Sequence, residues 1–351
     1  ADVDQNGVGL GDHSDSDGLE QPGGNVEINV TTGSSGENNH TYDFGFVPTD
    51  YGDLPDTYGT SVAQNGPWHY INTAIKLGGC VDGEINGQPE AMAGFMTGGD
   101  DNNAGPGSIG DCPGNGDDED GITFSTPIVP GAQACVTVTA MNMTGAPVIL
   151  QGWMDWNGNG TFDANEQLTT GGFAPAGAVV PVGGLNNIQI CFTVPVDATF
   201  QGGALFSRFR ISPNGGLSPN GGGIDGEVED YKLPLAKIGN LVWRDYNYDG
   251  QQNEPVDAGI DGATVQLVWA GPDADINTTN DNRTYTTVTS TMGGVPGMYM
   301  FIGLLPGTYR VSIPSSPGGA IPTLINVGNP VTDSNNPAGV TVTIPNPISL
   351  P

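Results

Sequence analysis

The stretch whose residue types and spacing best support chemistry is DWNGNGTFDANE, residues 155–166. Gly160 occupies position 6 of this stretch, where a calcium-binding loop of this length turns sharply, and Thr161 at position 7 can offer its carbonyl. Oxygen-bearing side chains occupy positions 1, 3, 5, 9 and 12, which are Asp155, Asn157, Asn159, Asp163 and Glu166. The spacing therefore predicts a Ca²⁺ site. The alternative is an Asn/Gly turn without a metal ion.

A second acidic loop begins at Asp245 and places oxygen side chains at alternate positions before Gly250. The acid that closes such a loop should stand at position 12, but Val256 occupies that position. Glu254 and Asp257 are both candidates for the closing ligand, and the sequence does not choose between them. The predicted Ca²⁺ ligands of this loop are Asp245, Asn247, Asp249, Gln251, Glu254 and Asp257.

Weaker acidic clusters occur elsewhere in the chain. Each either holds calcium or is a solvated acidic surface, since like charges this close disfavour each other without a cation. The clusters are Asp2, Asp4 and Asn6 before Gly7, then Asp273 and Asp275 with Asn277 and Asp281, and the acidic runs at residues 117–120 and 225–230.

The inventory of catalytic side chains is poor. The three histidines are His13, His40 and His69, and none stands near a serine or cysteine nucleophile motif. No Gly-rich phosphate loop precedes a helix pattern. The sequence therefore predicts no catalytic site and a protein that is not an enzyme. Three tryptophans could stack on sugars, although core packing is the favoured interpretation: Trp68, Trp153 and Trp156.

The elements that must position these loops are short strands. The chain has 351 residues, of which 57 are Gly and 28 are Pro, and its apolar runs are brief, alternating and bounded by turn residues. This pattern predicts an all-β protein of tandem Ig-like β-sandwich modules. The clearest alternating run, ALFSRFRIS at residues 204–212, places Phe209 and Ile211 on one face and Arg208 and Arg210 on the other.

The net charge of the chain restricts the kinds of partner that it can bind. The chain has 39 acidic and 8 basic residues, a net charge of −31. Nucleic-acid binding depends on basic patches, so this class of partner is excluded, and an anionic membrane surface would repel the chain. No apolar run is long enough to span a membrane. Self-repulsion of this size opposes compactness unless cations neutralise it.

The cysteines are even in number and show no CxxC spacing, which favours disulfides formed in an oxidising compartment over zinc binding. Cys135 and Cys191 lie in strand-like runs, and Cys80 and Cys112 flank one long loop. The predicted pairs are Cys80–Cys112 and Cys135–Cys191, although four cysteines allow three pairings. The chain begins at Ala1 without a signal peptide, as in a mature product or an excised repeat.

Residues 49–235 contain four motifs in a characteristic order. They are DYGDLPDTYGT (50–60), VDGEINGQP (81–89), DDEDGITF (117–124) and GEVEDY (226–231). In kind and order they resemble the GEVED domain of secreted bacterial proteins. The resemblance implies an extracellular β-sandwich and brings little mechanism with it.

Residues 237–351 resemble a different module. IGNLVWRDYNYDG (238–250) is similar to the first strand and calcium loop of the SdrD B-like repeat of bacterial surface adhesins. GMYMFIGLLPGTYRVSIP (297–314) is similar to its central hairpin. The family pattern ends in a strand with the sequence DFGF, which here stands at residues 43–46.

Residues 237–351 of one copy, followed by residues 1–48 of another, would therefore complete one B-type module. A tandem array, or a polymer in which one copy completes the sheet of the next, explains this arrangement. An ordinary fragment with truncated modules is the remaining alternative. We expect a structural subunit or repeat of a bacterial extracellular filament, stalk or surface array, rigidified by calcium. The rival hypothesis is an adhesin or carbohydrate-binding module on a cell-surface stalk.

Overall fold

The computed structural model describes residues 19–20, 26–27, 47–81, 83, 86–87, 118–199, 203–329 and 332–345. The chain divides into two compact units, residues 1–48 and 49–351. In the first unit, β1 (Leu19–Glu20) pairs antiparallel with β2 (Val26–Glu27). Asp2, Asp4, Asn6, the DFGF run at 43–46 and Cys112 lie outside the described residues.

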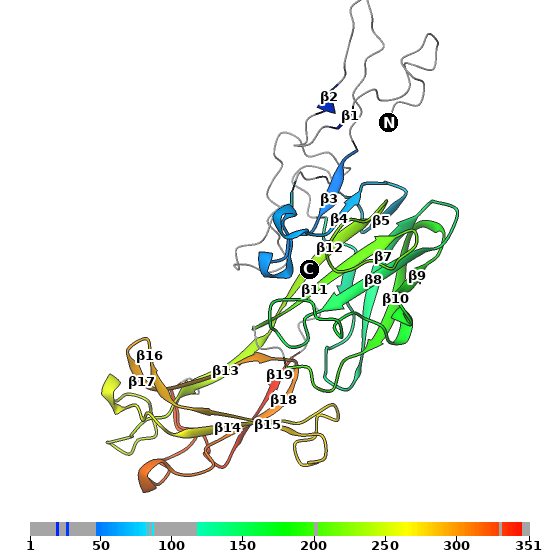
Figure 1. The fold of residues 1–351 in the computed structure, drawn as a ribbon. Helices are drawn as coiled ribbons and strands as arrows, with labels where there is room; N and C mark the ends of the chain where they lie inside the picture. Colours follow the sequence, from blue (N-terminus) through cyan, green and yellow to red (C-terminus); the bar gives the residue numbers. More distant parts are fainter. Residues whose placement is uncertain are drawn as a thin grey trace, which may run out of the picture. The chain divides into compact units, whose positions relative to one another are not determined.

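The second unit contains two β-sandwiches, which we call the first sandwich (residues 49–235) and the second sandwich (residues 236–345) (Figure 1). One sheet of the first sandwich has the order β10-β7-β5, with β6 also paired to β7, and the facing sheet has the order β12-β11-β8-β9. A short pair, β3 and β4, stands beside β12. The strands are β3 (Thr49–Tyr51), β4 (Trp68–Tyr70), β5 (Ile75–Leu77), β6 (Ile122–Phe124), β7 (Gln133–Asn142), β8 (Val148–Met154), β9 (Ala178–Val180), β10 (Gly183–Thr193), β11 (Ala204–Ser212) and β12 (Glu227–Pro234). Short 3-10 turns are η1 (Asp56–Tyr58), η2 (Val62–Gln64) and η3 (Gly171–Phe173).

Alternation along the strands builds the core of the first sandwich. Leu205, Phe209 and Ile211 of β11 are at most 1% exposed and pack with apolar residues of both sheets. Strand β11 coincides with the run predicted from sequence, residues 204–212. Burial of this interdigitated apolar face is what holds the two sheets together.

The opposite face of β11 is buried as well, which alternation does not predict. Arg208 and Arg210 are each 0% exposed. Arg208 Nε and Nη2 donate to the two carboxylate oxygens of Asp230 on β12, each at 2.7 Å. Arg210 donates to the carbonyls of Ser218 and Gly221, at 2.7 and 2.8 Å. These contacts tie the irregular chain before β12 to the outside of the sheet.

A disulfide crosses from β7 to β10. Cys135 and Cys191 stand directly opposite each other in the antiparallel register, with Cα atoms 4.0 Å apart. Their pairing agrees with the sequence-based prediction. Cys80 is also disulfide-bonded.

The second sandwich is built from sheets of order β13-β17-β16 and β15-β14-β18-β19. Residues 297–314 were expected to form a central hairpin, and this expectation is wrong: β17 and β18 belong to different sheets. Phe301 of β17 and Tyr309 of β18 therefore enter one core from opposite sides. The strands are β13 (Ala236–Leu241), β14 (Thr264–Trp269), β15 (Arg283–Val288), β16 (Ser290–Met292), β17 (Val295–Leu304), β18 (Gly307–Ser312) and β19 (Val340–Ile344), with 3-10 turns η4 (Val256–Ala258) and η5 (Pro317–Gly319).

The core of the second sandwich is only partly covered. Six of its residues are buried, whereas eight apolar residues that pack against them keep part of their surface exposed, among them Ile238, Tyr299 and Ile344. Among the described residues of the first sandwich, 25 core residues are buried and three apolar neighbours are partly exposed. In the described part of the chain, β13 pairs only with β17 and β19 only with β18, so each has one open edge.

Candidate functional site

The loop that follows β8 folds around the carboxylate of Asp155. The Asp155 carboxylate accepts hydrogen bonds from the backbone N–H groups of Gly158 at 2.7 Å, Asn159 at 3.2 Å and Gly160 at 2.9 Å. Gly158 and Gly160 have φ values of 70° and 85°, which favour glycine. The loop thus turns around the first of its predicted ligands.

The remaining predicted ligands gather in the same loop. Glu166, the closing acid, accepts hydrogen bonds from the N–H groups of Trp156 at 2.9 Å and Asp163 at 2.8 Å. The Asp163 carboxylate accepts from the side-chain amides of Asn157 and Asn159, both at 3.0 Å. Thr161 donates its backbone N–H to Asn159 Oδ1 at 2.9 Å. All six predicted residues therefore line one compact loop of oxygen donors, which is the donor set that calcium prefers.

The two acids that open and close this loop are buried. Asp155 is 1% exposed and Glu166 is 0% exposed. The pKa of Glu166 is raised to about 7, mainly by burial and also by the nearby carboxylate of Asp155. Tyr58 donates its hydroxyl to Asp155 Oδ2 at 2.6 Å, and burial raises the pKa of this tyrosine as well. A divalent cation would compensate the charge of ionised Glu166, which has no counterion among the described residues.

The loop that follows β13 repeats the same turn. Asp245 Oδ1 accepts from Tyr248 N at 2.6 Å, and Asp245 Oδ2 accepts from Gly250 N at 2.9 Å. The corresponding distances to Asp155 are 2.7 and 2.9 Å. Tyr248 has a φ of 64°, which is uncommon for a residue other than glycine. The loop after β8 in the first sandwich and the loop after β13 in the second sandwich thus have the same turn geometry.

The two candidates for the closing acid of this second loop differ in their contacts. Glu254 Oε1 accepts from Tyr246 N at 3.2 Å, as Glu166 accepts from Trp156 in the first loop, and Glu254 Oε2 is buried without a hydrogen-bond partner among the described residues. Asp257 lies in η4 and is exposed, without a described contact to the loop. Of the two candidates, Glu254 is the one that lies at the loop.

Asn247, Asp249 and Gln251 also lie where predicted. The Asp249 carboxylate accepts from Asn247 Nδ2 at 3.0 Å and from Gln251 N at 2.8 Å. The sequence analysis missed two residues that contact this loop. Asn253 donates to Asp249 Oδ2 at 2.8 Å, and its position 9 in the loop could have indicated this role. Thr323 donates its hydroxyl to Asp245 from 78 residues away, and no local sequence signal points to it.

The weaker cluster at Asp273 and Asp275 forms an exposed turn. Asp273 Oδ1 accepts from Asp275 N at 2.9 Å, and Asp275 Oδ1 accepts from Asn277 N at 3.0 Å. These are local contacts that a turn makes without a metal ion. Within the described ranges, no group of three or more His, Cys, Asp or Glu side chains already surrounds a common point. In the two loops above, backbone and amide N–H groups occupy the carboxylate oxygens instead.

Other predicted functional side chains are packed. Trp153 and Trp156 are 2% and 4% exposed, so neither offers a face to a sugar. His69 is fully buried, its Nε2 accepts from Arg210 Nε at 3.0 Å, and burial lowers its pKa to about 3. This geometry supports a structural role for His69 in a buried polar network.

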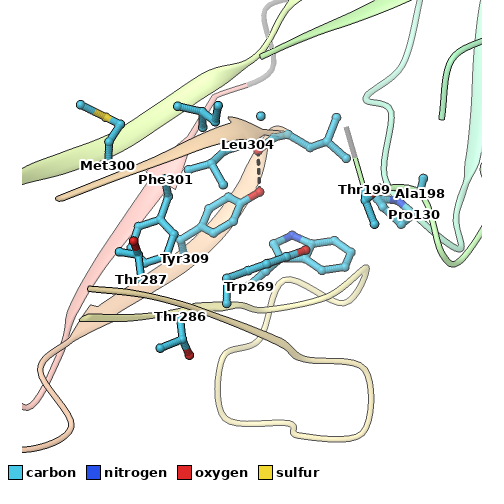
Figure 2. Close-up of a pocket in the computed structure, with 14 residues that line it drawn as sticks. Pro130, Ala198, Thr199, Trp269, Thr286, Thr287, Met300, Phe301, Leu304 and Tyr309 are labelled. Carbon is cyan, nitrogen blue, oxygen red and sulfur yellow. Dashed lines mark hydrogen bonds between the residues drawn. The ribbon is translucent and has the colours of Figure 1, made fainter. Parts of the chain in front are cut away.

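A pocket of about 450 Å³ lies beside β14 and β17 (Figure 2). Its wall includes Trp269, Phe301, Leu304 and Tyr309, and the Tyr309 hydroxyl donates to Leu305 O at 2.9 Å. No His, Cys, Asp, Glu, Lys or Arg is among its lining residues in the described part of the chain. The pocket therefore offers apolar surface and hydroxyls but no acid–base pair.

Comparison with known families identifies the modules. The model of the GEVED domain matches residues 149–234, and the model of the SdrD B-like domain matches residues 236–346. The chain contains a GEVED domain followed by an SdrD B-like domain. The Asp155 loop therefore belongs to the GEVED domain, and the Asp245 loop belongs to the B-like domain.

Relatives of the B-like domain occur in staphylococcal proteins. Serine-aspartate repeat-containing protein D of Staphylococcus aureus (strain Newman) is 33% identical over 147 residues, which is 40% of this chain and 10% of that protein. Protein C of the same series and strain is 32% identical over 159 residues, covering 45% and 14%. The chain thus spans only a small part of these relatives. Among solved structures, the group B streptococcus pilus 2b backbone protein matches 64% of this chain and 89% of that chain, with 12% identity and a TM-score of 0.30. In the described residues, no helix is long and apolar enough to cross a membrane.

Proposed function

We propose that this chain is a structural unit of a bacterial extracellular filament, stalk or surface array. Its GEVED and B-like domains serve as spacers, and copies join head to tail when a segment of one copy completes the B-like domain of the next. Bound Ca²⁺ stiffens the Asp155 and Asp245 loops. The B-like domain's kinship with staphylococcal repeat-containing proteins supports a surface location.

The observation that carries the assembly proposal is the half-covered core of the B-like domain. Eight apolar residues that contact its buried core remain partly exposed, and β13 and β19 each have an open edge among the described strands. An added strand would bury that apolar surface and supply main-chain hydrogen bonds to an open edge. The segment with the matching family pattern is residues 25–48, which contains the DFGF run.

Truncation tests the assembly. The full chain should form concentration-dependent oligomers in light scattering, and residues 49–351 alone should stay monomeric. A synthetic peptide of residues 25–48 should then bind the truncated chain and raise its melting temperature, whereas a scrambled peptide should not. A full chain that stays monomeric at high concentration, with a truncated chain of equal stability, would refute head-to-tail completion.

The calcium proposal is supported by the repeated turn geometry of the two loops and by the buried Glu254 oxygen, which has no partner among the described residues. Glu254→Gln should abolish calcium binding at the second loop in calorimetric titration. Asp257→Asn is the matched control, because it removes the same charge three residues away, outside the loop. Equal calcium binding by both variants would contradict the assignment of Glu254.

A further inference from the structure

Two acids of the GEVED motif point into the first sandwich instead of toward solvent. Glu227 stands opposite Ile211, and Glu229 stands opposite Phe209, in the β11–β12 register. Residues that pair directly across two strands share a face of the sheet, and Phe209 and Ile211 face the core. Glu227 and Glu229 are 0% and 1% exposed. Carboxylates buried there are costly unless a partner compensates them.

The two carboxylates differ in how their oxygens are satisfied. Glu229 Oε1 accepts from Gly121 N at 2.8 Å, and its Oε2 accepts from the Tyr231 hydroxyl at 3.1 Å. Glu227 Oε2 accepts from Leu77 N. Glu227 Oε1 is buried and has no hydrogen-bond partner among the described residues. One oxygen of a fully buried carboxylate thus has no donor in the described part of the chain.

The segment before β6, whose described part is residues 118–121, contacts Glu229 through Gly121 N and brings more carboxylates. Its residues Asp118 and Glu119 are each 5% exposed. The segment approaches β5 so closely that a Cβ on Gly121 would lie 2.6 Å from Gly78 N, which explains why a glycine stands there. Residues 118–121 and the β12 acids Glu227 and Glu229 therefore meet at one end of the sandwich.

A fifth acid comes from β3. Asp50 is 1% exposed and accepts from Val228 N at 2.6 Å. Burial is the main cause that raises the pKa of Glu227, and the carboxylates of Glu229, Asp50 and Asp118 raise it further. These acids lie close enough to Glu227 for their charges to interact.

The neighbouring Asp230 shows what a compensated acid looks like in this domain. Both of its oxygens accept from Arg208 at 2.7 Å, and its Oδ2 also accepts from Asp53 N and Leu54 N. It lies on the other face of β12 and needs no further partner. Glu227 has one N–H donor and no such cation among the described residues, so the burial of Glu227 calls for a separate explanation.

We propose that Glu227, with Asp50, Asp118, Glu119 and Glu229 around it, forms a second calcium site of the GEVED domain. Glu227 Oε1 is its central ligand. The donor set is all oxygen and rich in carboxylates, without His or Cys among these residues, which suits a hard cation such as Ca²⁺ and not Zn²⁺. Since the described carboxylates do not already surround a common point, binding has to draw them together, and it would pin the segment before β6 to β12.

Counting bound ions tests this site directly. Equilibrium dialysis of the full chain against ⁴⁵Ca²⁺ should show that Glu227→Gln binds one ion fewer per chain than the wild type. In chelator, Glu227→Gln should melt at the same temperature as the wild type or higher, because a buried unpaired charge is gone. When calcium is added, the melting temperature of Glu227→Gln should rise less than that of the wild type. Asp225→Asn is the matched control and should keep the full count, because Asp225 lies outside the cluster.

The outcomes separate this site from the two loops. Asp155→Asn and Glu254→Gln report on the loops alone, so their failure to lose an ion would count against the proposed function and leave the Glu227 site standing. If Glu227→Gln does not fold by circular dichroism, Asp118→Asn takes its place in the count. The proposal is wrong if the folded Glu227→Gln or Asp118→Asn variant binds as many calcium ions per chain as the wild type.

Discussion

Glutamine in place of Glu166 perturbs the loop of residues 155–166, the first proposed calcium site, with little change in shape. Glu166 is fully buried and accepts N–H groups from Trp156, Asn157 and Asp163, at 2.9, 3.3 and 2.8 Å. Burial raises its pKa to about 7 from an ordinary value of 4.5. Between these two pH values, the calcium-free folded state holds a proton that the unfolded state has released. Stability therefore falls as pH rises through this window.

The size of the effect follows from that pKa difference, at about 1.4 kcal/mol for each pH unit. Without calcium, ionisation of Glu166 should cost the wild type about 3 kcal/mol of unfolding free energy between the two pH values. A glutamine side chain does not ionise, so the Glu166→Gln variant should lack this part of the pH dependence. It should also lack most of the calcium effect, which for one site at a hundredfold excess over Kd is about 2.7 kcal/mol.

Urea unfolding followed by tryptophan fluorescence measures both effects, at pH 4.5 and pH 7.5, in chelator and in calcium. At pH 4.5, the difference in unfolding free energy between the wild type and Glu166→Gln measures the cost of replacing a carboxyl oxygen by an amide group. We expect about 1 kcal/mol for the lost hydrogen-bond acceptor. Asp197→Asn, an exposed acid outside both loops, is the control. The reasoning would be refuted if the difference in unfolding free energy between wild type and variant were the same at both pH values and calcium stabilised both proteins equally.

Three further variants test an ion pair, a disulfide and a strained turn residue. Arg208→Met leaves the buried Asp230 carboxylate without its bidentate partner at 2.7 Å, and should lower the unfolding free energy by about 3–5 kcal/mol in urea; an unchanged midpoint would contradict a fully formed pair. Serine at both Cys135 and Cys191 removes a cross-link between residues 56 apart, and should cost about 4 kcal/mol in guanidinium unfolding. Tyr248→Gly relieves a φ of 64° at a side chain that is 76% exposed, and should raise stability by about 1 kcal/mol in calcium-free calorimetry; a loss of stability would show that the ring contributes more than the strain costs.

Local features of this protein could be predicted from its residues alone. The spacing of Asp155 to Glu166 predicted a loop that turns around its first acid, because a short carboxylate can reach the N–H groups of the next few residues. Alternation at residues 204–212 predicted a strand with an apolar face, because side chains of a strand point to opposite sides in turn. The pairing of Cys135 with Cys191 followed from their place in two strand-like runs.

Contacts between residues far apart in the chain became visible only in the folded sheets. The fold separates β17 from β18, because a Pro-Gly turn can lead into the facing sheet as well as back along the same one. It brings Thr323 to Asp245 and favours Glu254 over Asp257, which spacing left open. It also divides the acids of the GEVED motif, since strand alternation turns Asp230 outward to Arg208 and Glu227 inward to the buried acids. Sequence identifies such residues as acidic, but only the packed sheets show which of them pairs with an arginine.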